Sequence, residues 1–296
     1  MEQLYEVAGL SRQAFHQWLI PTAKQIERTP AKLVLELANY VRSNYLPGSS
    51  SREVYSFIRK RQDLELNPKL IGWGKHAFEN LCLTNGLRIV SKRFKPKTTI
   101  RGAYIFPNLI EGMVITDINL IWVSDICYIF DNNGKLIGYA TSLIDVYSRM
   151  LLGLSFSKTM RAIETSLAVL KQAFKCRDKA SLIATIFHSD GGKQYIYKPF
   201  LKLLGSANIR SSMAENCYEN PHAESFNDTL KNHILLQYNL NSFTQLKKQE
   251  KFIKYAYNNY KVHTGIERFT PIEYEQHIKT LKPFQRTKLE IKIIEN

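Results

Sequence analysis

The stretch Asn220-Pro-His-Ala-Glu-Ser-Phe-Asn-Asp-Thr-Leu-Lys231 organises the rest of the chain. Asparagine is a favoured N-cap and proline suits the first helical position, so the sequence predicts a helix that starts at Pro221. Helical spacing gives this helix one apolar face, formed by Ala223, Phe226, Leu230 and Ile234. Glu224, Asp228 and Lys231 share a polar face. Such a helix is either a solvated amphipathic helix or the carrier of a functional carboxylate.

A second segment, NLIWVSDICYIF over residues 119–130, predicts a strand that contains a single acid, Asp125. Alternate residues of a strand share one face, which places Asp125 in an apolar row with Val123 and Cys127. A carboxylate in such a row is costly unless it meets a cation or hydrogen-bond donors. Asp125 is therefore a candidate functional residue.

A third acid, Asp190, follows the apolar run 183–187, which predicts a buried strand. Gly191 and Gly192 come directly after it and allow another backbone or a ligand to approach closely. Taken alone, an Asp-Gly turn is ordinary. Together, Asp125, Asp190 and Glu224 predict a site of hard oxygen ligands for Mg²⁺ or Mn²⁺. Two such ions serve in-line phosphoryl displacement without a nucleophilic side chain.

At these residues the chain resembles the DDE transposases of bacterial insertion sequences, in particular the OrfB-type proteins of the third insertion-sequence family. The matching segments are Trp122–Tyr128, Leu143–Arg149, His188–Tyr195, Asn216–Asn220, Glu224–Phe226, Leu230–Lys231, Tyr257–His263 and Thr270–Pro271. The resemblance implies an RNase H-like integrase catalytic core with a mixed sheet flanked by helices. It also implies that Asp125, Asp190 and Glu224 are catalytic metal ligands, with two ions per site. The implied reaction is cleavage of phosphodiester bonds at element ends and joining of the 3′-OH to target DNA.

Two departures from the family pattern keep alternatives open. The spacing of 33 residues between Asp190 and Glu224 is slightly shorter than usual, and Lys261 stands where the family usually has arginine. Lysine keeps the charge but lacks the planar fork that grips a phosphate bidentately. The alternatives are a catalytically silent DNA-binding repressor of its own element, and a nuclease of the same fold without strand transfer.

The charge of the chain favours nucleic acid as its partner. Its 296 residues carry 41 Lys and Arg against 26 Asp and Glu, a net charge of +15. No apolar run reaches membrane-spanning length and no signal-peptide pattern is visible, so a cytoplasmic, nucleoid-associated protein is expected. The four cysteines form no CxxC pair and are interpreted as reduced thiols.

The chain divides into five predicted parts. Residues 1–45 predict a helix-turn-helix-like DNA-binding unit and 46–87 a second helical DNA-binding subdomain. Residues 88–116 predict a basic linker arm, 117–280 the catalytic core and 281–296 a basic tail. Within the core, helices are expected over 160–174 and 243–260. The predicted DNA contacts are Arg12, Gln13, His16, Lys92, Arg93, Lys95, Lys97, Asn220, Lys231, Lys261 and His263.

Assembly is expected to need more than one copy, because joining two ends of double-stranded DNA requires at least two active sites. No leucine-zipper heptad is visible in the sequence. In the resembled family, a separate upstream reading frame, of the OrfA type, usually supplies that function. We therefore expect a homo-oligomer on DNA that needs such a partner or a fused form.

Overall fold

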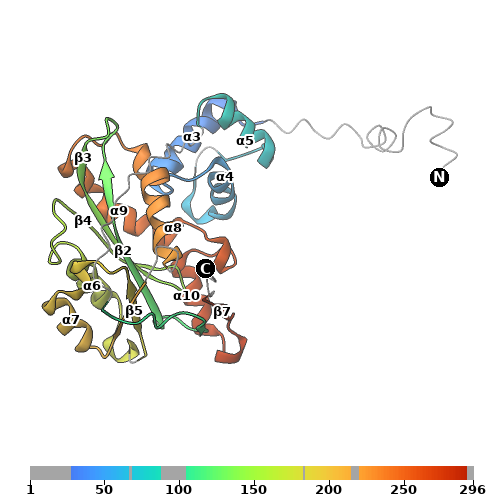
Figure 1. Cartoon of the computed structure of the whole chain (residues 1–296). Helices are drawn as coiled ribbons and strands as arrows, with labels where there is room; N and C mark the ends of the chain where they lie inside the picture. Colours follow the sequence, from blue (N-terminus) through green and yellow to red (C-terminus); the bar gives the residue numbers. More distant parts are fainter. Residues whose placement is uncertain (1–27, 67–68, 88–104, 183, 215–219, 292–296) are drawn as a thin grey trace, which may run out of the picture.

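The computed structural model describes residues 28–66, 69–87, 105–182, 184–214 and 220–291. Its centre is a five-stranded sheet with strand order β4-β3-β2-β5-β6 (Figure 1). The strands are β2 (Ile121–Phe130), β3 (Leu136–Asp145), β4 (Leu151–Ser157), β5 (Ile186–Ser189) and β6 (Arg210–Met213). β2, β3 and β4 pair antiparallel, whereas β5 runs parallel to β2 and β6 parallel to β5. This mixed sheet has the order and directions of the RNase H-like fold, as predicted.

The hairpin between β2 and β3 turns at Asp131–Gly134. Asp131 Oδ1 accepts hydrogen bonds from the backbone N–H groups of Asn133 and Lys135, at 2.9 and 2.8 Å. Gly134 has φ of +80°, a conformation that favours glycine. The tight turn fixes the register of the two long strands.

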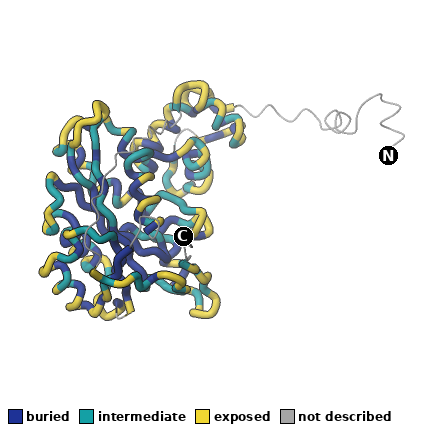
Figure 2. The backbone as a smooth tube through the Cα atoms, in the orientation of Figure 1, coloured by how far each residue is buried: buried dark blue, intermediate teal, exposed yellow. Residues whose placement is uncertain are grey.

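Helices cover both faces of the sheet and make a three-layer core (Figures 1 and 2). One face carries α8 (Pro221–Thr229), α9 (Phe243–Tyr260) and α10 (Pro271–Thr280). The other carries α6 (Ser166–Cys176) and α7 (Lys198–Gly205). Short 3-10 turns lie at Gln62–Leu64, Lys179–Leu182, Lys193–Ile196, Leu235–Gln237, Thr264–Ile266 and Pro283–Gln285.

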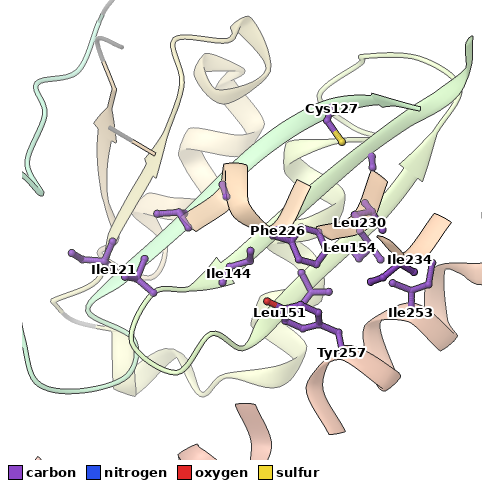
Figure 3. Packing of buried hydrophobic residues seen from close by; sticks show 14 of the residues in the cluster. Ile121, Cys127, Ile144, Leu151, Leu154, Phe226, Leu230, Ile234, Ile253 and Tyr257 are labelled. Carbon is purple, nitrogen blue, oxygen red and sulfur yellow. The ribbon is translucent and has the colours of Figure 1, made fainter. Parts of the chain in front are cut away.

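The apolar face predicted for the helix at residue 221 is buried against the sheet. Ala223, Phe226, Leu230 and Ile234 all belong to the core cluster that the first face of the sheet shares with α9. Figure 3 shows Phe226 and Leu230 between the strands and Tyr257. The predicted start at Pro221 is confirmed, and residues Leu230–Ile234 continue the helix as one π-helical turn.

The helix expected over 160–174 is shorter than predicted, because α6 begins only at Ser166. The backbone first closes a turn in which Thr165 N donates to Arg161 O, at 3.1 Å. The side chain of Thr165 donates to the same oxygen at 2.9 Å. Thr165 itself has φ of −110° and ψ of −103°, outside the helical region, so α6 starts only after it.

Three N-terminal helices, α3 (Ala31–Asn44), α4 (Ser51–Lys60) and α5 (Lys75–Thr84), share one hydrophobic cluster. The division predicted after residue 45 falls inside this packed unit. Tyr45 and Phe57 pack edge-on against Tyr260 of α9, with ring centroids 5.2 and 5.8 Å away. At Gly48, with φ of +79°, an added Cβ would lie 2.4 Å from the backbone carbon of His233. The helical unit therefore packs closely on the π-helical turn that follows α8.

Part of the predicted arm and part of the predicted tail pair with each other. β1 (Val114–Ile115) and β7 (Leu289–Glu290) form a two-stranded antiparallel sheet. Leu289 and Ile291 also pack against the first core cluster. No helix in the described parts of the chain is long and apolar enough to cross a membrane.

Candidate active site

Two of the predicted acids meet at adjacent strands. Ser124 of β2 pairs with Ser189, the last residue of the parallel strand β5, so Asp125 and Asp190 are the next residues along the two neighbouring segments. Neighbouring strands lie about 4.8 Å apart, and laterally matched residues point to the same face. This face is the one that α8 covers, because Val123 and Cys127 belong to the same core cluster as α8. The predicted face of Asp125 is therefore confirmed.

The third acid is carried by α8, whose start is fixed to β2 by Asn220. The side chain of Asn220 is 5% exposed, and its Nδ2 donates to Ser124 O at 3.1 Å rather than capping the helix. The side chain of Asn220 thus makes an internal hydrogen bond, and its predicted contact with DNA stays a prediction. Glu224, one turn later, is exposed on the side of α8 that does not enter the core.

Asn227 is a site residue that the sequence reasoning missed. It lies three residues after Glu224 and is 4% exposed, and its Nδ2 donates to Asp125 Oδ2 at 2.7 Å. Asp125 Oδ1 accepts a second bond, from Ile126 N at 2.7 Å. The available signal was helical spacing, because residues i and i+3 lie on neighbouring positions of one helix. Asn227 holds the orientation of the Asp125 carboxylate.

Burial dominates the electrostatics of the three acids. Burial raises the pKa of Asp125 to about 7, and the charges of Asp190 and Glu224 add to this effect. Burial also raises the pKa of Asp190 and of Glu224. Lys231, in the π-helical turn, opposes the effect by lowering the pKa of Asp125 and Glu224. All three carboxyls therefore bind protons more readily than free side chains do.

These residues fit a divalent metal ion by their chemistry. Carboxylate oxygens are the hard ligands that Mg²⁺ and Mn²⁺ prefer, and a cation would relieve the repulsion that raises the pKa of Asp125. Among the described residues, no three acidic, histidine or cysteine side chains already converge on one point. The side chain of Glu224 is exposed, so it can change rotamer and turn toward Asp125.

Asp145, a fourth acid near the sheet, has a structural environment. It is fully buried, and its carboxylate accepts backbone N–H groups from Asn119, Tyr147 and Ser148, at 2.7, 3.0 and 3.1 Å. Burial raises its pKa to about 6. These bonds hold the turn after β3, so Asp145 has a structural function.

The remaining predicted contacts have different surroundings. Lys261 Nζ forms an ion pair with Glu53 of α4 at 3.2 Å, so it links the helical unit to the core. His263 lies beside a pocket together with Arg149 and His222. The other predicted contacts, Arg12, Gln13, His16, Lys92, Arg93, Lys95 and Lys97, lie outside the described residues.

Comparison with known proteins gives the same architecture. An integrase core domain family matches residues 116–217, and a second family of that description matches residues 207–271. The insertion element IS600 uncharacterized 31 kDa protein of Shigella sonnei is 26% identical, over 92% of this chain and 97% of that protein. The putative transposase InsK for insertion sequence element IS150 of Escherichia coli K12 is 29% identical, over 93% of each chain.

Two solved structures are also similar to this chain. The HTLV-2 integrase catalytic core domain in complex with magnesium has a TM-score of 0.40 and 19% identity, over 53% of this chain and 95% of that chain. The simian T-cell lymphotropic virus intasome has a TM-score of 0.43 and 19% identity, over 76% and 74%.

The strand order and the matched domains define a protein with an RNase H-like integrase core. The relatives that span nearly its whole length are proteins of insertion elements, so the chain is similar to the insertion-sequence transposases of the retroviral-integrase superfamily. This similarity supports a transposase function in DNA recombination.

Proposed function

We propose that this chain cuts phosphodiester bonds at the ends of its insertion sequence and joins each freed 3′-OH to target DNA. The observation that carries the proposal is the juxtaposition of Asp125 and Asp190 on matched strands beneath the helix of Glu224. The pKa of about 7 for Asp125 supports it, because Asp190 and Glu224 both act on that carboxyl. Neighbouring carboxyls with raised pKa values in a basic protein are expected where a cation is held beside DNA.

In this proposal, Asp125, Asp190 and Glu224 hold two divalent ions, Mg²⁺ or Mn²⁺. When bound, such ions stabilise charge on the attacking and leaving oxygens of an in-line displacement. Asn227 orients Asp125, and Asn220 keeps the start of α8 against β2. First, water displaces the 3′ oxygen of the element end, which leaves as a 3′-OH. This 3′-OH then attacks a phosphate of the target and displaces a second 3′ oxygen.

Binding to DNA is proposed to rest on basic segments away from the acids. These are the helix-turn-helix-like unit with Arg12, Gln13 and His16, and the arm with Lys92, Arg93, Lys95 and Lys97. Lys231 is proposed to contact the DNA beside the carboxylates. The working form is proposed to be a homo-oligomer on DNA in the cytoplasm, assembled with an OrfA-type partner or as a fusion with it.

The test is incubation of the pure protein with Mn²⁺ and labelled candidate element ends, with nicked and joined products scored separately. Asp125→Asn, Asp190→Asn and Glu224→Gln keep side-chain volume and remove one charge each. We expect each to abolish both products, because both steps share one set of ligands. Binding without metal is expected to stay unchanged or rise, since a carboxylate repels the phosphate.

Asp228→Asn is the matched control, because Asp228 is an exposed acid on the same helix. It should retain cleavage and joining. If Glu224→Gln cleaves as well as the wild type, the assignment of α8 to catalysis is wrong. Nicks without any joined product would identify a nuclease instead, and specific binding without nicks would identify a repressor.

A further inference from the structure

A pocket of about 250 Å³ lies on the flank of α8 that faces away from the three acids. His222, Ser225 and Thr229 line it from α8, and they share one side of the helix because they are three and seven residues apart. Glu224 lies two residues after His222, so the two side chains are about 200° apart around the helix axis. The pocket is therefore separate from the acid cluster, although the same helix borders both.

Arg149 gives this pocket an uncompensated positive charge. The residue follows β3 with φ of +62°, and its guanidinium contacts the ring of His222, with Nη1 3.1 Å from Nε2. Within the described parts of the chain it forms no ion pair with a carboxylate. Asp145 acts on it only through space, since the Asp145 oxygens accept backbone N–H groups. The side chain is half-buried, and burial lowers the pKa of Arg149.

The other walls of the pocket add polar groups and leave room above the guanidinium. His263 Nε2 is buried and has no hydrogen-bond partner. An added Cβ on Gly265 would lie 3.6 Å from Arg149 Nη2, so the missing side chain opens the approach to that nitrogen. Ser225 and Thr229 contribute hydroxyl groups. None of the described residues that line the pocket is aspartate or glutamate.

This set of groups is suited to an anion with several oxygens. A guanidinium is a planar fork that binds phosphate oxygens bidentately, and hydroxyl and imidazole groups complete such sites. The volume is below the range of about 300–1,000 Å³ that is usual for drug-sized ligands, which favours a single small group over a nucleoside. A buried imidazole nitrogen without a partner is costly, so a ligand that satisfies it would be stabilised.

We propose that this pocket binds one backbone phosphate of the DNA substrate, held by Arg149 and His263. The inference rests on the proposed function for its ligand and deepens it by adding a positioning site. A phosphate held on one flank of α8 fixes the DNA relative to the acids on the other flank. Arg149 then acts as a positioning residue for the strand that reaches Glu224.

The test measures DNA binding by the full chain in EDTA, so it does not depend on metal or catalysis. Affinity for a duplex of about 30 base pairs is measured over a range of salt concentrations, because each phosphate contact adds about 0.9 to the log–log slope. The variants are Arg149→Gln, which removes the fork, and Gly265→Ala, which keeps Arg149 and places a methyl group over it. The control is Arg210→Gln. Arg210 is exposed at the start of β6, and the acids lie beyond the other end of this strand, where Met213 pairs with Ser189.

Arg149→Gln is expected to bind about 10-fold more weakly at moderate salt and to lose about one unit of slope. Gly265→Ala should shift both quantities in the same direction, whereas Arg210→Gln should match the wild type. Asp125→Asn should bind DNA with the wild-type salt slope, because binding in EDTA does not need the metal ligands. This test of the pocket can therefore be decided even if the catalytic proposal fails. The melting temperature of each variant shows whether it is folded. If Arg149→Gln is unfolded, Gly265→Ala decides the outcome.

A second arm separates DNA from a free anion. Inorganic phosphate should raise the melting temperature of the wild type and leave that of Arg149→Gln unchanged. If it does so while both variants keep the wild-type affinity and slope for DNA, the pocket holds a free anion and the proposal is wrong. If neither DNA affinity nor the response to phosphate changes, the arginine is purely structural, which also overturns the proposal.

Discussion

Replacing Asp125 with asparagine is expected to raise the free energy of unfolding at neutral and alkaline pH. In the folded protein the pKa of Asp125 is about 7, against an ordinary value of 3.8. The folded state therefore binds this proton more tightly than the unfolded state does. The resulting destabilisation is absent below about pH 4, grows between about pH 4 and 7, and is complete above about pH 7.

The size of the effect follows from the pKa and from the contacts of the carboxylate. A change from 3.8 to about 7 corresponds to an upper bound of about 4 kcal/mol, at about 1.4 kcal/mol per pH unit. Asp125 accepts hydrogen bonds from Ile126 N and Asn227 Nδ2, and asparagine, with a single acceptor oxygen, keeps one of them. The loss of the other costs about 1–3 kcal/mol, because it leaves a buried donor unpaired. The net gain expected for Asp125→Asn is about 1–2 kcal/mol at about pH 8.

Urea unfolding at several pH values between about 5 and 8.5 measures this difference. The gap between Asp125→Asn and the wild type should vanish or change sign at about pH 5, because the penalty of the buried charge is then only about 1.7 kcal/mol and no longer exceeds the cost of the lost bond. Asp228→Asn, at an exposed position, should stay within about 0.5 kcal/mol of the wild type throughout. Excess Mn²⁺ should stabilise the wild type more than Asp125→Asn, because only the wild type keeps the full set of ligands. A gap that is absent at pH 8, or that does not change with pH, would refute the reasoning.

The remaining predictions concern DNA, assembly and the fold. Replacing Lys92, Arg93 and Lys95 with alanine should weaken binding about equally for all duplexes and reduce the salt slope by roughly 2–3; an unchanged slope would make residues 88–101 a plain linker. Isolated protein should self-associate only weakly, and light scattering with paired element ends checks this; a stable, specific paired-end complex without a partner would contradict it. Glu275→Gln should cost about 3–5 kcal/mol in urea unfolding, because it leaves buried Arg177 without its carboxylate partner. A loss below about 1 kcal/mol would show that this pair contributes little.

The sequence alone determined the parts of this protein that depend on local pattern. Residue alternation put Asp125 on the covered face of its strand, and helical spacing together with Pro221 set the start and the buried face of α8. The turn at Asp131–Gly134 and α9 over 243–260 were also predictable, because each depends on residues close together in the chain. The resemblance to a known family supplied the fold class and linked three distant acids. The capping box of Thr270 and Glu273, which starts α10, is also a local pattern that the sequence shows.

Only the tertiary structure decided which side chains meet across the sheet and between the layers. The bond from Asn227 to Asp125 joins residues 102 positions apart, and the pocket of Arg149, His222 and His263 joins three separate segments. Burial also gave Asp125 its raised pKa and left Arg149 without a carboxylate partner among the described residues. Strand register and helix packing bring such residues together, and these long-range contacts leave no signal in the local spacing of one sequence.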